Sequence, residues 1–111
     1  MIDSEDKTNV LVIDDEQDLR DGCERILKRM SCQVFKASTG EEGISLYQKH
    51  HISIVLCDLK MPGIDGIEVL RRLKDLDENV LVIIITGFAT IDTAVEAMKQ
   101  GAYDYLVKPF D

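Results

Sequence analysis

The chain has 111 residues, of which 45% are hydrophobic and 31% charged, and its formal net charge is −8. This length and composition predict one globular domain spanning residues 1–111, and they exclude a disordered tail. The acidic balance argues against direct binding to nucleic acid, and no apolar stretch approaches the ~20 residues of a membrane span.

Strand and helix patterns alternate along the chain. Apolar runs at 10–13, 52–57, 80–85 and 103–107 predict strands, and the mixed run at 33–37 predicts an edge strand. Helices are expected at 18–30, from Thr39 to Lys49, after Asp65 and after Thr90, with Gly101 ending the last one. Helical spacing assigns inward faces to Leu19, Cys23, Ile26, Leu27 and Met30 in the first helix, Val69, Leu70, Leu73 and Leu76 in the third, and Ile91, Ala94, Val95 and Met98 in the fourth.

This alternation predicts an α/β fold, a doubly wound parallel sheet with helices on both faces. The chain stops at Phe110 and Asp111, straight after the last predicted strand, where a final helix would cover part of one face. We therefore expect an N-terminal fragment of a longer protein, with the final helix missing or truncated.

The cysteines and the first seven residues indicate the cellular compartment of the protein. Cys23, Cys32 and Cys57 are odd in number and lack metal-ligand spacing, which predicts reduced thiols in or near the core. The acidic, polar segment 1–7 does not have the pattern of a signal peptide. We expect a cytoplasmic protein.

Polar residues stand where four of the predicted strands end. Asp14 and Asp15 follow the first run, Asp58 follows the second long run, Thr86 the next, and Lys108 the last. Ligands of open α/β sheets bind at the carboxyl ends of the strands, so these side chains should converge. Each alone reads most simply as a helix cap, a strand end or a surface lysine. Their joint occurrence points to a site.

Three carboxylates and one lysine leave two negative charges, which a divalent cation would neutralise. Oxygen donors favour Mg²⁺, with Mn²⁺ as a substitute, and argue against zinc. An aspartate such as Asp58 can act as a nucleophile towards phosphorus, while Lys108 and Thr86 contact phosphoryl oxygens. The cluster therefore predicts metal-assisted phosphoryl transfer.

The motifs together resemble the receiver domain of two-component response regulators, most of all the receivers of enhancer-binding transcription activators. The matching segments are 10–16, 57–66, 85–87 and 103–110. The resemblance implies a flavodoxin-like fold, a five-stranded sheet of order 2-1-3-4-5. It further implies a phosphorylation-dependent switch, not a turnover enzyme, that takes its phosphoryl group from a sensor histidine kinase and controls an output domain. A homodimer is a further partner that the resemblance offers.

The resemblance also assigns roles to residues. Asp58 is the expected phosphoacceptor, and Lys108 and Thr86 are expected to contact the phosphoryl group. Asp15, Asp58 and the backbone carbonyl of Lys60 are the expected Mg²⁺ ligands, with Asp14 acting largely through water. Thr86 and Tyr105 are the expected switch pair, and the Lys108–Pro109 peptide is expected to be cis.

Three alternatives stay open on the sequence. Similar endings occur in the receivers of hybrid sensor kinases, and a pure interaction module could share the fold without being phosphorylated. A phosphatase of the haloacid-dehalogenase type also uses a strand-end aspartate, but it needs a second aspartate where Lys60 stands. The set of Asp14, Asp15, Asp58, Thr86 and Lys108 favours the receiver.

Overall fold

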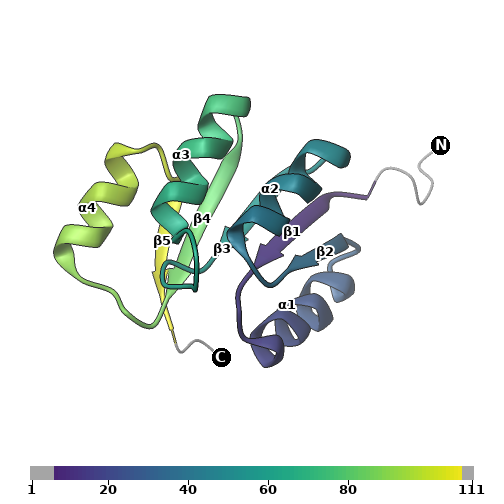
Figure 1. Ribbon diagram of the computed structural model, residues 1–111. Coiled ribbons are helices and arrows are strands. Elements are labelled where there is room, and N and C mark those ends of the chain that lie inside the picture. Colours follow the sequence, from purple (N-terminus) through teal and green to yellow (C-terminus); the bar gives the residue numbers. More distant parts are fainter. Residues whose placement is uncertain (1–6, 109–111) are drawn as a thin grey trace.

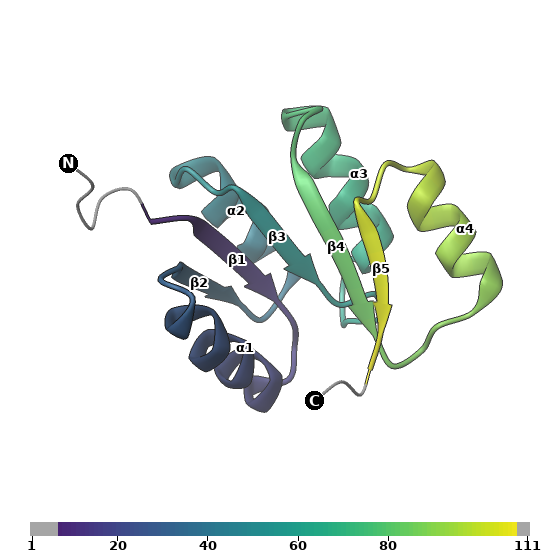
Figure 2. The same cartoon turned by 180° about the vertical axis from the view of Figure 1, so that it is seen from behind.

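The computed structural model describes residues 7–108 and shows a twisted sheet with helices on both faces (Figures 1 and 2). Five parallel strands lie in the order β2-β1-β3-β4-β5. Their bounds are β1 Asn9–Ile13, β2 Gln33–Ala37, β3 Ile54–Cys57, β4 Leu81–Thr86 and β5 Asp104–Val107. The predicted doubly wound sheet and its strand order are confirmed, and β2 is an edge strand as expected.

The helices are α1 Gln17–Arg29, α2 Gly40–Lys49, α3 Gly66–Leu76 and α4 Ile91–Lys99. Three of them begin at a capping side chain: Thr39, Asp65 and Thr90 each accept a hydrogen bond from an amide three residues later. Gly101 ends the segment after α4 with a φ of 99°, as predicted. None of the helices in the described part of the chain is long and apolar enough to cross a bilayer.

Two apolar clusters hold these layers together. The larger lies on the side of α2, α3 and α4 and contains Leu11, Ile13, Leu70, Leu73 and Ile84. The smaller lies under α1 and contains Val10, Val12 and Cys23. Side chains alternate between the faces of each strand, which is why β1 contributes to both clusters.

The face that carries α1 is covered over β1 and β2 only (Figure 2). The strand register places Leu81 beside Ile54 and Leu106 beside Ile85, so these side chains share that face. Leu81 is 41% exposed and Leu106 is 43% exposed. Within residues 7–108, therefore, no helix covers the β4–β5 part of this face, in agreement with the expected absence of a final helix.

One predicted helix face was wrong, and the faces of two other helices were correct except at their margins. In α4, Ile91, Val95 and Met98 point to solvent, whereas Ala97 is fully buried against the sheet. In α1, Ile26 and Met30 are exposed because α1 lies at the border of the covered area, and Leu76 at the last turn of α3 is also exposed. The spacing correctly grouped the α4 residues on one face, but that face is turned away from the core.

Candidate functional site

The carboxyl ends of β1, β3, β4 and β5 meet at one edge of the sheet. Backbone hydrogen bonds continue past the strand ends: the Asp58 amide donates to Ile13 at 2.9 Å, and the Lys108 amide donates to Thr86 at 2.8 Å. The Asp14 amide likewise donates to Ala37 at 3.0 Å. These bonds fix the backbone of Asp14, Asp58, Thr86 and Lys108 at the edge.

Lys108 joins the acidic side chains there. Its Nζ lies 3.0 Å from Asp14 Oδ2, 3.3 Å from Glu16 Oε1 and 3.5 Å from Asp58 Oδ2. Asp14 is 1% exposed and Asp58 is 4% exposed, so both carboxylates have been removed from water. One partly buried lysine cation thus compensates two buried carboxylates and a third that is mostly exposed.

Electrostatics distinguish the two buried partners. Burial, together with the neighbouring charge of Asp14, raises the pKa of Asp58 above its ordinary value, and Lys108 only partly opposes this. Burial alone would lower the pKa of Lys108, but its hydrogen bond to Asp14 and the charges around it raise that pKa overall. Lys108 is therefore held as a cation, whereas the ionised form of Asp58 is disfavoured without further positive charge.

The second oxygen of Asp58 has no partner. Asp58 Oδ1 is buried and makes no hydrogen bond with any of residues 7–108. An unsatisfied buried carboxylate oxygen is costly, by about 1–3 kcal/mol or more. An orphaned buried carboxylate oxygen keeps its lone pairs available to a cation or to an incoming phosphoryl group.

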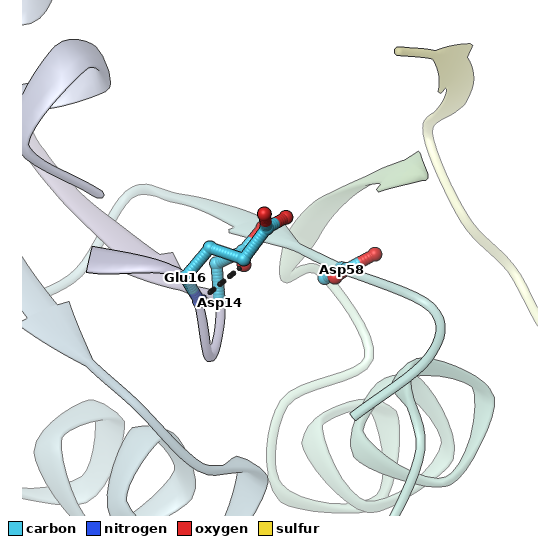
Figure 3. Close-up of side chains that lie close together, drawn as sticks. All are labelled: Asp14, Glu16 and Asp58. Atoms are coloured by element: carbon cyan, nitrogen blue, oxygen red, sulfur yellow. Dashed lines mark hydrogen bonds between the residues drawn. The ribbon is translucent and has the colours of Figure 1, made fainter. Parts of the chain in front are cut away.

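Oxygen atoms of Asp14, Glu16 and Asp58 all lie within 4.8 Å of one another (Figure 3). Three carboxylates with one lysine leave two negative charges, and hard oxygen donors suit Mg²⁺. Asp15, by contrast, is exposed and does not belong to this group. The sequence predicts the Asp15 side chain in the acidic cluster, whereas in the structure the side chain of Glu16 lies there.

The other predicted residues lie around this centre. Thr86 is fully buried, and its Oγ1 accepts a hydrogen bond from the Phe88 amide at 3.0 Å. Tyr105 is partly buried, with its hydroxyl against α4. The Lys60 ammonium lies 4.9 Å from the centre of the Phe88 ring, a cation–π contact beside the site. The predicted cis peptide between Lys108 and Pro109 lies outside the described residues.

Two site features were missed on the sequence. Glu16 directly follows the Asp14-Asp15 pair, but acidic residues at the start of a helix are common caps, and this hid its place in the cluster. Gly66, the first residue of α3, packs against the backbone of Asp58 and Leu59, and its amide donates to the Leu59 carbonyl at 2.7 Å. The sequence signal for this close approach was a glycine directly after the capping residue Asp65.

Comparison with known proteins agrees with this geometry. Residues 10–111 match the family model described as "Response regulator receiver domain". The chain is 36% identical over 102 residues to sporulation initiation phosphotransferase F of Bacillus subtilis (strain 168), covering 92% of this chain and 82% of that protein. It is 35% identical over 108 residues to the transcriptional regulatory protein ZraR of Klebsiella oxytoca, covering 97% of this chain but only 24% of that protein.

A solved structure is similar throughout. The crystal structure of the CheX-CheY-BeF3-Mg+2 complex from Borrelia burgdorferi aligns with a TM-score of 0.90 and 31% identity, covering 94% of this chain and 80% of that one. The chain thus spans most of a single-domain relative and about a quarter of ZraR. Strand order, strand-end residues and the family match over residues 10–111 lead to one conclusion: the chain belongs to the response regulator receiver domain family.

Proposed function

We propose that Asp58 is the phosphoacceptor of a Mg²⁺-dependent signalling switch, phosphorylated by a sensor histidine kinase. The observation that carries this proposal is the state of the Asp58 carboxylate, which is buried, bound through one oxygen to Lys108 and unpartnered at the other. In the transfer, Asp58 Oδ1 forms a bond to phosphorus while the bond from phosphorus to the kinase histidine breaks. The electron pair of that bond returns to the histidine nitrogen.

Lys108 and Thr86 supply the charge and the hydrogen bond that the new group needs. Lys108 already lies within 3.5 Å of Asp58 Oδ2, so its ammonium can neutralise a phosphoryl oxygen with little displacement. The Thr86 oxygen accepts from Phe88, which leaves its own O–H free to donate to a second phosphoryl oxygen. Positioning and charge compensation of this kind are most of what phosphoryl transfer requires.

The Mg²⁺ site is proposed to include Asp14, Asp15, Asp58 and the backbone carbonyl of Lys60, with Mn²⁺ as a substitute. The donors fit a hard divalent ion, since the described cluster holds only carboxylate oxygens and one lysine. When bound, the ion would supply positive charge to the phosphoryl oxygens. Asp15 is exposed one residue after Asp14, where a modest movement of the loop before α1 would bring it to the ion.

Output is proposed to pass through Thr86 and Tyr105 to the surface of α4 and β5. When the Thr86 hydroxyl turns to the phosphoryl group, the loop to α4 shifts and the environment of Tyr105 changes. The affected surface is apolar: Ile91 is 84% exposed, Val95 52% and Val107 55%. Exposed apolar area of this kind suits a partner or a second copy of the chain.

The whole protein is proposed to be a cytoplasmic transcription regulator whose output domain responds to this receiver. Relatives such as ZraR, which are about four times longer than the matched region, support a transcriptional output. A hybrid sensor kinase is the alternative setting for the same domain. In either, the receiver acts as a switch that assists its own phosphorylation and dephosphorylation.

The test is phosphorylation of the chain by acetyl phosphate with Mg²⁺. Wild-type protein and the Asp75→Asn variant, which changes an exposed aspartate on α3, should gain one labile phosphoryl group by mass spectrometry. The Asp58→Asn variant should gain none, and chelation of the metal should stop the reaction in all three. A labile phosphoryl group on the Asp58→Asn variant would show that the acceptor lies elsewhere.

A further inference from the structure

Glu16 occupies the N-cap position of α1 without capping it. Its backbone is extended, with φ −92° and ψ 116°, and its side chain accepts no hydrogen bond from the first turn of the helix. The carboxylate instead reaches Lys108, with Oε1 3.3 Å from Nζ. A residue that forgoes the usual stabilisation of a helix start, about 1 kcal/mol, has its side chain committed elsewhere.

The backbone of the loop orients Glu16 towards the cluster. Asp14 Oδ1 accepts a hydrogen bond from the Glu16 amide at 2.8 Å (Figure 3). This bond holds the Glu16 backbone beside Asp14, and carboxylate oxygens of Glu16, Asp14 and Asp58 lie within 4.8 Å of one another. Asp15 lies between them in sequence, yet it is exposed and outside that group.

A second, independent observation points to a ligand at this place. Asp58 Oδ1 is buried in the same cluster and has no hydrogen-bond partner among the described residues. Lys108 cannot satisfy the whole cluster, because one positive charge faces the three carboxylates Asp14, Glu16 and Asp58. The deficit of two charges matches one divalent cation.

We propose that Glu16 is an additional carboxylate of the cation site, beside Asp14 and Asp58, and raises its affinity for Mg²⁺. This inference rests on the proposed metal-dependent function but goes beyond it, because the receiver resemblance assigns the ion to Asp14, Asp15, Asp58 and the backbone carbonyl of Lys60. Glu16 contributes negative charge at the mouth of the site. Its side chain is 67% exposed and can adjust to an ion, whereas Asp14 at 1% exposure is fixed.

The experiment measures metal binding, not phosphorylation. Mn²⁺ is titrated into the protein and the free ion is followed by electron paramagnetic resonance, with Mg²⁺ competition giving the second affinity. The variants are Glu16→Gln, Glu16→Asp and Asp18→Asn. Asp18 lies exposed in the first turn of the same helix, so its variant removes one nearby charge without touching the cluster.

Glu16→Gln should weaken the affinities for Mn²⁺ and Mg²⁺ about threefold to tenfold. The effect should be small because the Glu16 carboxylate is largely exposed, and solvent screens its charge. Asp18→Asn should change them less than twofold, and Glu16→Asp should fall between wild type and Glu16→Gln. Thermal melts without metal should show all variants folded, since the changed side chains are largely exposed.

The failures are separable. Wild-type protein that binds neither ion saturably would overturn the cation site and the proposed function with it. Wild-type protein that binds, with Glu16→Gln equal to wild type or to Asp18→Asn, would overturn the role of Glu16 alone. Tighter metal binding by the Glu16→Gln variant would overturn the role as well, because it would show that Glu16 opposes metal binding in the wild-type protein.

Discussion

The hydroxyl of Tyr105 on β5 lies 2.7 Å from the hydroxyl of Thr93 on α4. Thr93 Oγ1 also lies 3.1 Å from the Thr90 carbonyl and accepts a hydrogen bond from the Thr90 amide at 3.1 Å. Thr90 and Thr93 form the reciprocal capping box that begins α4. The proposed switch tyrosine is thus bonded to the N-terminal cap of the helix whose surface it is proposed to control.

Removing this bond should loosen the start of α4. We expect Tyr105→Phe and Thr93→Val each to lower the free energy of unfolding by about 1 kcal/mol, as measured by urea denaturation. The two changes should be non-additive in the double variant because they break a shared network. Tyr103→Phe is the control, since Tyr103 is 66% exposed, and a loss equal to that of Tyr105→Phe would contradict the role of the bond.

Asp58→Asn should stabilise the protein without metal. The pKa of Asp58 is raised above its ordinary value of 3.8 by burial and then by Asp14, so its ionised form is destabilising in the folded state. Stability associated with this group is full below pH 3.8 and is lost as the pH rises through the raised pKa. At neutral pH the variant should therefore be more stable than wild type.

Denaturation at several pH values checks this expectation. The advantage of the Asp58→Asn variant should shrink as the pH falls towards the ordinary aspartate pKa, where wild-type Asp58 is protonated in both states. An advantage that persists unchanged into acid would show that packing, not charge, is responsible.

Gly66→Ala should damage both the fold and the site. A Cβ at position 66 would lie 2.9 Å from the Leu59 Cα and against the Asp58 carbonyl, so backbone would have to move. We expect a loss of about 1–3 kcal/mol in unfolding free energy and slower phosphorylation by acetyl phosphate, because Asp58 moves with that loop. At Gly87 a Cβ would meet only the Lys108 Cβ at 3.9 Å, so Gly87→Ala should fold normally.

Tyr47 should make stability fall at high pH. Burial, followed by a 3.0 Å hydrogen bond to Asp77, raises the pKa of Tyr47 from 10.0 to about 12. Its contribution is fully present below pH 10 and disappears as the pH rises to about 12. The stability difference between wild type and Tyr47→Phe should therefore be constant up to pH 10 and then decrease.

Tyrosinate absorbance provides the direct measurement. Titration of wild type should show a tyrosine ionisation step at about pH 12, and this step should be missing in Tyr47→Phe. A late step retained in the variant would assign it to another tyrosine.

The sheet and most of the site could be predicted because strand-end chemistry is local in sequence. Asp14, Asp58, Thr86 and Lys108 each follow a strongly apolar run, and parallel pairing brings those ends together whatever the loops do. The α4 face could not be predicted in this way. Periodicity shows that Ile91, Val95 and Met98 share a face, but Ala97 allows the opposite side to approach the sheet closely.

Glu16 shows a different limit. At the start of a helix an acidic residue has an ordinary explanation, favourable charge near the helix N-terminus. Only the position of Lys108, 92 residues further along the chain, shows that the Glu16 carboxylate pairs with a lysine and does not cap the helix. Long-range partners of this kind are not encoded in any local pattern.

The bond between Lys108 and Asp14 joins positions 94 residues apart. Because β5 follows the other four described strands in the chain, a growing chain has its acidic residues in place well before the lysine that balances them. Contacts of such long sequence separation form late and slowly. The proposed phosphoacceptor should therefore gain its lysine partner only after β5 has been synthesised, so that a chain ending before β5 would hold the acidic cluster without its compensating charge.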